Sequence, residues 1–273
     1  MIILKIIDAH MHLNKDIESF YELAKVSEHE YSEKGIKDMF DKYGVVGGVV
    51  MGNRDLELEN HIYPNYLNYL VGVDGVCFDK NKKEYFLELV EKHLKRDNCK
   101  GIKIYAGYVP LYVYDEWYFP FYELAKKYNK PVAIHTGSTS KSDAYLKYSH
   151  PLTLDDVCTL FPDVNFVMCH FGNPWLNDAA AVITKNMNLY ADISGILVGK
   201  PNMNSFFDEY EGYISMLKTW ISYTGAYDRI MFGTDFPLVN MGCCIEFAKK
   251  IIPKKYYNKV FYENAVKIYN LNF

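Results

Sequence analysis

Residues of types that bind metal ions stand at the ends of several apolar, strand-like runs. His10 and His12 close the first run, and because side chains alternate along a strand, residues two apart point to the same side. His135, His170 and Asp235 each end or follow a later run. Several imidazoles with one carboxylate suit Zn²⁺ or a related divalent cation that keeps an open coordination position. The pattern therefore predicts one metal centre assembled from several strands.

A cation in this centre would lower the pKa of a coordinated water, so that hydroxide becomes available near neutral pH. Asp235 could bind the cation and also take up or return a proton, while His170 could hydrogen-bond the water or polarise a substrate oxygen. A single histidine at a strand end is more often a packing residue than a ligand. The prediction therefore depends on four separate runs that each end in a ligand-type residue.

Short apolar runs recur along the chain and alternate with amphipathic stretches. Several runs are continuously apolar, which is typical of strands that are covered on both faces. The expected strands are Ile2–Asp8, Val45–Met51, Tyr69–Val76, Gly101–Tyr105, Val132–His135, Asn165–His170, Leu189–Ile193 and Arg229–Phe232. The expected helices are Lys82–Leu94, Glu116–Tyr128, Thr153–Phe161, Phe206–Tyr223, Cys243–Ile251 and Asn258–Tyr269.

Eight strands with helices in most of the gaps predict an α/β fold, a (β/α)8 TIM barrel formed by one domain over residues 1–273. A doubly wound open sheet is the alternative, but it usually carries a glycine-rich turn after its first strand, where this chain has Asp8 to His12. Barrel enzymes place catalytic groups at the C-terminal ends of their strands, which is where the metal-binding residue types stand. The region 14–35 and the loop 52–66 are long for plain connections, and such stretches commonly shape an active site.

Composition argues against several classes of function. The net charge of −4 and the presence of only three arginines, Arg54, Arg96 and Arg229, argue against nucleic acid as a partner. The chain has no phosphate-binding loop, dinucleotide fingerprint or Gly-x-Ser-x-Gly elbow. No apolar run reaches the length of a transmembrane helix and no secretion signal is evident, so we expect a cytoplasmic protein without a membrane partner. The six cysteines, which lack C-x-x-C spacing, are expected to be free thiols.

The order of these motifs resembles the amidohydrolase superfamily. The residues that carry the resemblance are Asp8-Ala9-His10-Met11-His12 after the opening strand, then His135 and His170, and finally Gly233-Thr234-Asp235-Phe236-Pro237. The closing segment, in which Asn264 precedes small and apolar positions, is similar to the terminal helix of the amidohydrolase-related branch. That branch holds aminocarboxymuconate-semialdehyde decarboxylase, related decarboxylases, and lactone or amide hydrolases. The resemblance extends from Ile7 to Leu271.

The resemblance implies a deformed barrel with one divalent metal ion, expected to be zinc. The implied ligands are His10, His12, His135 and Asp235, with His170 beside them as a catalytic residue or as the ligand of a second ion. Relatives with two metal ions use a carboxylated lysine from the fourth strand, where this chain has Lys103. An unmodified Lys103 would instead pair with a substrate carboxylate, and one metal ion is the favoured alternative.

Two activities compete on this scaffold. The favoured one is hydrolysis of an amide, cyclic amide or lactone by a metal-activated water, with Asp235 passing a proton to the leaving group. The second is non-oxidative decarboxylation of an unsaturated or aromatic acid, and a third alternative is a barrel that binds metal without catalysis. The expected partner is a small molecule that can carry a carboxylate, bound by Lys103 and Tyr105. The sequence leaves the oligomeric state open, and a homodimer is one alternative because relatives of this branch often dimerise.

Other candidate residues carry weaker signals. Arg54 could meet an anionic substrate, and the tyrosine-rich loop after Lys103 would supply aromatic walls if it capped the barrel mouth. Packing or surface roles are expected for the four histidines that lie in helical or loop stretches, namely His29, His61, His93 and His150.

Overall fold

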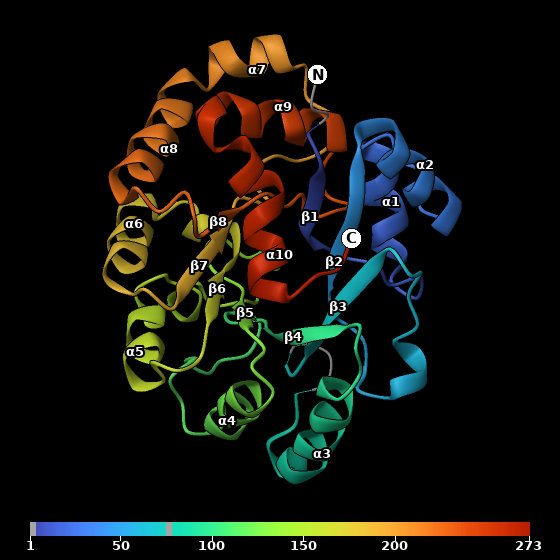
Figure 1. Ribbon diagram of the computed structural model, residues 1–273, viewed down its shortest axis with the longest axis vertical. Coiled ribbons are helices and arrows are strands. Elements are labelled where there is room, and N and C mark those ends of the chain that lie inside the picture. Colours follow the sequence, from blue (N-terminus) through green and yellow to red (C-terminus); the bar gives the residue numbers. More distant parts are fainter. Residues whose placement is uncertain (1–3, 75–77) are drawn as a thin grey trace.

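Eight parallel strands, paired in sequence order, form a barrel surrounded by helices (Figure 1). The computed structural model describes residues 4–74 and 78–273. The strands are β1 (Ile6–Met11), β2 (Val45–Met51), β3 (Leu67–Gly72), β4 (Cys99–Ile104), β5 (Val132–Ile134), β6 (Phe166–Met168), β7 (Leu189–Asp192) and β8 (Ile230–Met231). Hydrogen bonds from Ala9 N to Phe232 O and from His12 N to Phe236 O join β1 to the chain after β8. The predicted (β/α)8 TIM barrel is confirmed.

All eight expected strands are present, with ends that differ by a few residues. The largest difference is in β1, which continues to Met11, so that His10 lies inside the strand and His12 directly after it. Every residue of β1 is buried, as expected for a strand covered on both faces. The start of the expected first strand and the end of the expected third strand lie outside the described residues.

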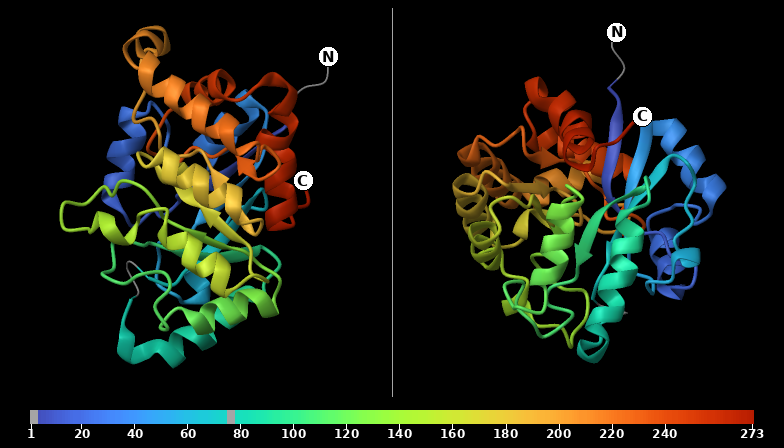
Figure 2. Two further views of the ribbon diagram at one scale, coloured as in Figure 1. Left: turned by 90° about the vertical axis from the view of Figure 1, so that its left-hand side faces the viewer. Right: turned by 60° about the horizontal axis from the view of Figure 1, so that its bottom comes forward.

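Helices pack around the outside of the strands, as Figure 2 shows. They are α1 (Glu18–Val26), α2 (Glu33–Tyr43), α3 (Lys83–Leu94), α4 (Phe119–Lys127), α5 (Thr153–Leu160), α6 (Leu176–Lys185), α7 (Met203–Glu209), α8 (Glu211–Thr224), α9 (Met241–Ile251) and α10 (Asn264–Tyr269). Short 3-10 segments lie at Leu58–Asn60, Lys80–Lys82, Leu146–Tyr148, Cys169–Gly172 and Lys254–Tyr256, and a π-helical segment at Lys259–Glu263 precedes α10.

Two sequence-based expectations about helices are corrected. The region 14–35, in which no helix is expected from the sequence, contains all of α1 and the start of α2. The single helix expected over Phe206–Tyr223 is two helices, α7 and α8, because the backbone at Tyr210 leaves the helical region (φ −107°, ψ 22°). The apolar periodicity continues across this break, so the pattern alone does not reveal it.

The terminal helix closes the N-terminal end of the barrel. Ala265, Ile268 and Tyr269 of α10 pack in one buried cluster with interior strand residues such as Ile7 and Val167. The side-chain amide of Asn264 donates to the carbonyls of Tyr227 (2.9 Å) and Ile230 (2.7 Å), which fixes the helix beneath β8. The C-terminal ends of the strands remain open to a pocket.

All three arginines bind backbone carbonyls. Arg54 donates to Leu13 O (2.7 Å) and to Asn60 O, so its guanidinium joins two loops. Arg96 and Arg229 likewise donate to carbonyls of neighbouring segments. None of the three lines the main pocket, and the hypothesis that Arg54 meets an anionic substrate is not supported by this geometry.

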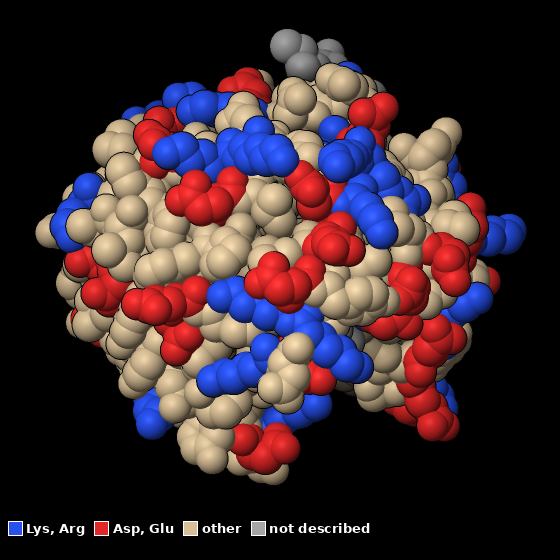
Figure 3. All heavy atoms as spheres, turned by 90° about the horizontal axis from the view of Figure 1, so that it is seen from below, with Lys and Arg blue, Asp and Glu red and all other residues tan. Residues whose placement is uncertain are grey.

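The surface carries charges of both signs, and the described cysteines are free, as expected. Acidic and basic side chains are interspersed on the face seen in Figure 3, without a large area of one sign. No helix among residues 4–74 and 78–273 combines the length and the apolar character needed to cross a membrane. The five cysteines within the described residues are free thiols and buried, while Cys77 lies outside them.

Candidate active site

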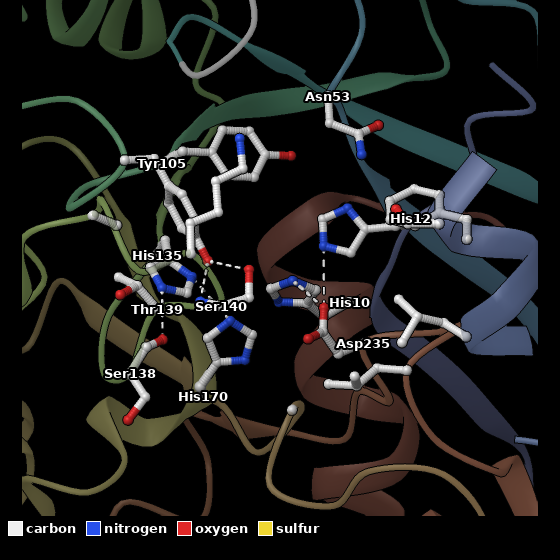
Figure 4. Close-up of a pocket in the computed structure, with 18 of the residues that line it drawn as sticks. His10, His12, Asn53, Tyr105, His135, Ser138, Thr139, Ser140, His170 and Asp235 are labelled. Atoms are coloured by element: carbon white, nitrogen blue, oxygen red, sulfur yellow. Dashed lines mark hydrogen bonds and ion pairs between the residues drawn. The ribbon is translucent and has the colours of Figure 1, made fainter. Parts of the chain in front are cut away.

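A cavity of about 940 Å³ opens at the C-terminal ends of the strands (Figure 4). Its lining includes every residue that the sequence proposes for the site, namely His10, His12, Lys103, Tyr105, His135, His170 and Asp235. These residues come from β1, β4 and the segments after β5, β6 and β8, so the barrel brings together residues up to 225 positions apart by number.

Three of the predicted ligands converge on one point. His10 Nε2 lies 3.4 Å and His12 Nε2 lies 3.0 Å from the same oxygen, Asp235 Oδ1. Among the described residues, these three form a group whose ligand atoms all lie within 4.8 Å of one another. Figure 4 shows both imidazoles pointing toward the Asp235 carboxylate.

The protonation of His10 is set by a carboxylate behind it. His10 Nδ1 lies 2.9 Å from Asp192 Oδ2, and both side chains are fully buried. Because a carboxylate only accepts, His10 donates through Nδ1 and leaves a lone pair on Nε2. Burial lowers the pKa of His10 to about 4, which keeps the ring neutral at physiological pH.

The facing atoms of His10 and Asp235 are both electron-rich. Burial acts to raise the pKa of Asp235, but His12, His170 and His10 outweigh it and hold the pKa well below its usual range. A carboxylate oxygen therefore faces the lone pair on His10 Nε2 at 3.4 Å, and His10 Nε2 has no hydrogen-bond partner, while His12 Nε2 lies 3.0 Å from that same oxygen. Two buried hydrogen-bond acceptors that face each other repel, unless a cation lies between them. The donor set therefore fits a divalent metal ion.

His135 is in the pocket but outside the compact group. Its Nε2 lies 3.1 Å from the carbonyl of Ser138, and its Nδ1 lies 3.2 Å from His170 Nε2. The structure thus brings together three of the four predicted ligands, and ligation by His135 stays a prediction.

The ring nitrogens of His170 have more hydrogen-bond contacts than the neutral ring has protons to donate. Its Nδ1 lies 2.9 Å from Ser194 Oγ and 3.2 Å from Ser194 O, while its Nε2 faces His135. His135 must keep its own proton on Nε2 to reach the carbonyl of Ser138, so a neutral His170 has one proton for two contacts. Burial lowers the pKa of His170 and favours this neutral form. The neutral ring can accept a proton on the pocket side and later return it.

Lys103 is a fully buried cation in the pocket wall. Its Nζ donates to Cys169 Sγ at 2.9 Å and lies 5.2 Å from the centre of the Tyr105 ring. Cys169 also forms a buried group with His10 and Asp192. The ammonium beside this sulfur repels a second cation, which favours Lys103 as a partner for an anion.

Tyr105 contributes its ring to the pocket. Its hydroxyl donates to Gly52 O at 2.6 Å, and its backbone N–H donates to Asp74 Oδ1. The phenol proton is therefore already used within the protein, and the ring forms an apolar wall. The loop after β5 forms another wall, where Tyr108 OH contacts Ser140 Oγ at 3.0 Å.

Sequence reasoning missed the residues that support the ligands. Asp192, at the end of β7, accepts from the backbone N–H of His170 (3.0 Å) as well as from His10. Asp8 accepts from Thr234 N (3.0 Å) and Thr234 Oγ1 (2.5 Å), and so holds β1 against the loop that carries Asp235. Burial raises the pKa of Asp8 to about 7. A signal for Asp192 existed, because a carboxylate interrupts the apolar run there as histidines do elsewhere.

The backbone is unusual at the two most important positions. His170 (φ 61°) and Asp235 (φ 64°) both adopt the left-handed region, which few residues other than glycine enter. Gly195 lies between them, and a Cβ atom at that position would stand 2.7 Å from His170 Nδ1 and 3.1 Å from Asp235 Oδ2. A residue without a side chain is therefore needed at position 195.

Comparisons with known proteins identify the family. An amidohydrolase family model matches residues 7–271, so the chain belongs to the amidohydrolase family. No curated protein matches the chain.

Solved structures with the same fold are distant in sequence. An uncharacterised TIM-barrel protein from Bordetella bronchiseptica has a TM-score of 0.72 at 19% identity, with 97% of this chain and 98% of that chain covered. The 2,6-dihydroxybenzoate decarboxylase from Rhizobium has a TM-score of 0.70 at 14% identity, with 97% and 98% covered. A dihydroxybenzoic acid decarboxylase from Polaromonas sp. JS666, with bound manganese and the inhibitor 2-nitroresorcinol, has a TM-score of 0.68 at 14% identity, with 98% of each chain covered.

Proposed function

We propose that this member of the amidohydrolase family is a metal-dependent decarboxylase of an aromatic or unsaturated carboxylic acid. The observation that carries the proposal is Lys103, a buried ammonium that lines the same pocket as the converging ligands His10, His12 and Asp235. An ammonium held out of water attracts a carboxylate strongly, whereas a neutral amide or lactone has no group that needs it.

The chain's own residues would bind the acid and move a proton. Lys103 would hold the carboxylate, and the apolar walls formed by Phe20 and the Tyr105 ring would hold the carbon skeleton. As the bond to the carboxylate breaks, its electron pair stays on the carbon, which must then receive a proton. His170 lines the pocket and would deliver this proton from the doubly protonated ring, which returns to the neutral form that burial favours.

A divalent cation bound by His10, His12 and Asp235 would supply a Lewis acid for the anionic oxygens of the substrate. We propose one such ion per chain, with His135 as the further predicted ligand. Zinc was the expectation from sequence, and the manganese in the Polaromonas structure makes Mn²⁺ an equal candidate.

This proposal reverses the order of the two activities favoured by the sequence. The sequence alone favours hydrolysis, but the similarity to dihydroxybenzoate decarboxylases and the buried ammonium both support decarboxylation. Hydrolysis of amides or lactones remains as the activity that the assay must separate from it.

The test is a substrate panel with protein purified without chelators and loaded in parallel with Mn²⁺ or Zn²⁺. Hydroxybenzoic acids, unsaturated acids, lactones and cyclic amides are assayed for CO₂ release and for ring-opened products. In D₂O, a decarboxylated product should carry deuterium at the carbon that lost CO₂. Ring opening without CO₂ release would establish the hydrolase instead.

A variant separates substrate binding from chemistry. Lys103→Met removes the ammonium but keeps a long apolar side chain, so KM for the acid should rise at least about tenfold while metal content is unchanged. An unchanged KM would remove Lys103 from substrate binding. Metal-dependent turnover absent across the whole panel would favour the non-catalytic alternative.

A further inference from the structure

A second concave surface lies beside the active-site cavity. This side groove has a volume of about 760 Å³ and is lined by residues that follow β6 and β7 and by α7 and α8. Its apolar walls include Pro174, Ile196, Val198 and Phe206, and Tyr210 and Tyr213 lie at its edge. Val198 is 63% exposed, so a large part of this apolar side chain is in contact with solvent.

The side groove adjoins the active-site cavity. Asn173 and Val198 line both of them. Asn173 is held firmly, because its carbonyl accepts from Ser138 N (2.9 Å) and its Oδ1 accepts from Tyr213 OH (2.6 Å). The same residue thus joins the loop that forms the wall of the cavity to α8, which forms the wall of the groove.

The two spaces differ in charge. The cavity holds the buried ammonium of Lys103 and the candidate metal ligands, while Glu209 is the only charged residue in the groove lining among the described residues. An anionic group therefore belongs in the cavity, and a neutral, largely apolar group fits the groove.

We propose that the side groove is a second substrate subsite, which takes an apolar extension of the acid that the cavity binds. The inference rests on the proposed function for the identity of the acid. The substrate class is thus an aromatic or unsaturated acid with an alkyl or aryl substituent far from its carboxylate. A second copy of the chain is a poorer occupant, because seating it on Asn173 and Val198 would also cover the cavity.

The test compares two acids by isothermal titration calorimetry on metal-loaded protein. One is 2,6-dihydroxybenzoate, and the other is the same acid with a butyl group on the ring carbon opposite the carboxylate. Burial of two or more methylene groups predicts at least about tenfold tighter binding of the substituted acid. Equal affinities would overturn the subsite.

Two tryptophan variants of α7 test whether the tighter binding of the substituted acid arises in the groove. Ser205 lines the groove and Asn204, its exposed neighbour on the same helix, does not. Ser205→Trp should fill the groove and bring the affinity ratio of the two acids close to one, whereas Asn204→Trp should keep the ratio of the wild type. A ratio unaffected by Ser205→Trp would contradict the proposal.

The other possible results of these experiments also test the subsite and the proposed function. If both acids bind with the expected ratio but neither releases CO₂, the proposed function fails and the subsite stands. If neither acid binds, both proposals fail. Sedimentation velocity covers the alternative occupant: a wild-type dimer that Ser205→Trp converts to a monomer would make the groove a subunit interface and overturn the subsite.

Discussion

Two groups of histidines in this chain are buried, apart from the half-buried His12, and they differ in what their nitrogen atoms contact. The mouth cluster consists of His10, His12, His135 and His170 at the ends of strands. The side cluster consists of His61 and His93, which are both fully buried with ring centres 4.6 Å apart. Burial lowers the pKa of both residues in the side cluster, as it does for most of the mouth cluster.

The side cluster uses its nitrogens to hold the fold together. His93 Nδ1 contacts Tyr69 OH at 2.8 Å, and His93 Nε2 donates to Leu56 O at 3.0 Å. His61 Nε2 donates to Asp55 O at 2.7 Å, and neither histidine joins a metal-type group among the described residues. A buried histidine with a lowered pKa is therefore no sign of function by itself. The distinguishing feature of the mouth cluster is a lone pair that faces a carboxylate.

The largest effect should come from removing the converging imidazoles. In the variant His10→Ala/His12→Ala, metal content should fall to background and turnover should be lost, because two of three converging donors are gone. Elemental analysis and the decarboxylation assay measure both. The matched control is His61→Ala/His93→Ala, which should retain its metal. Equal metal content in the two double variants would abolish the distinction between the clusters.

A smaller effect on metal binding is expected from replacing Asp192, which accepts a hydrogen bond from His10. In Asp192→Asn, the amide can donate to His10 Nδ1, which moves the ring proton to Nε2 and blocks ligation. Loss of such a supporting carboxylate typically weakens metal binding about 10- to 100-fold. Competition with a fluorescent chelator gives the dissociation constant for Mn²⁺ or Zn²⁺. Asp163→Asn, at an exposed ion pair with Lys126, is the control that should change nothing.

The side cluster should respond in stability and not in metal binding. His93→Ala leaves Tyr69 OH and Leu56 O without their buried partner and opens a cavity, so the free energy of unfolding should fall by about 2–3 kcal/mol. Urea denaturation measures this loss, and elemental analysis of the same sample should find the wild-type metal content. A variant that lost its metal would show that the side cluster also supports the site.

The smallest effect is a pH dependence of stability from His93. Burial lowers its pKa to about 4 in the folded chain, against 6.5 when unfolded. Between these values the unfolded chain binds a proton that the folded chain does not, so stability falls as the pH drops below 6.5. From pH 7 to pH 5 the loss should be about 1–2 kcal/mol. His93→Gln should show a shallower pH slope in urea denaturation, and an identical slope would contradict this origin.

The barrel was predictable because its strands are continuous apolar runs that end in polar residues. β2 was placed at its exact bounds, whereas α1 was missed and α7 was merged with α8. The local sequence pattern predicts which residues are buried. It does not predict the backbone angles at Tyr210, which separate two helices with the same apolar periodicity.

Three of the four predicted ligands, His10, His12 and Asp235, lie close together, but the residues that support them could not be found by a search for histidines. Asp192 supports His10 from the neighbouring part of the barrel, 182 positions away in sequence. The need for glycine at position 195 arises only where His170 and Asp235 approach each other in space. Both features depend on the closed barrel, so a local sequence pattern cannot predict them.

The left-handed backbone at His170 and Asp235 also limits how this site can change over evolutionary time. Apart from glycine, that region favours Asn, Asp and His and disfavours β-branched and bulky residues, although Phe171 (φ 46°) adopts it next to His170. These tolerated types are also donors to metals or carriers of protons. The main-chain conformation at positions 170 and 235 therefore limits which substitutions the fold tolerates, whatever their effect on activity. The tolerated substitutions tend to replace one reactive side chain with another.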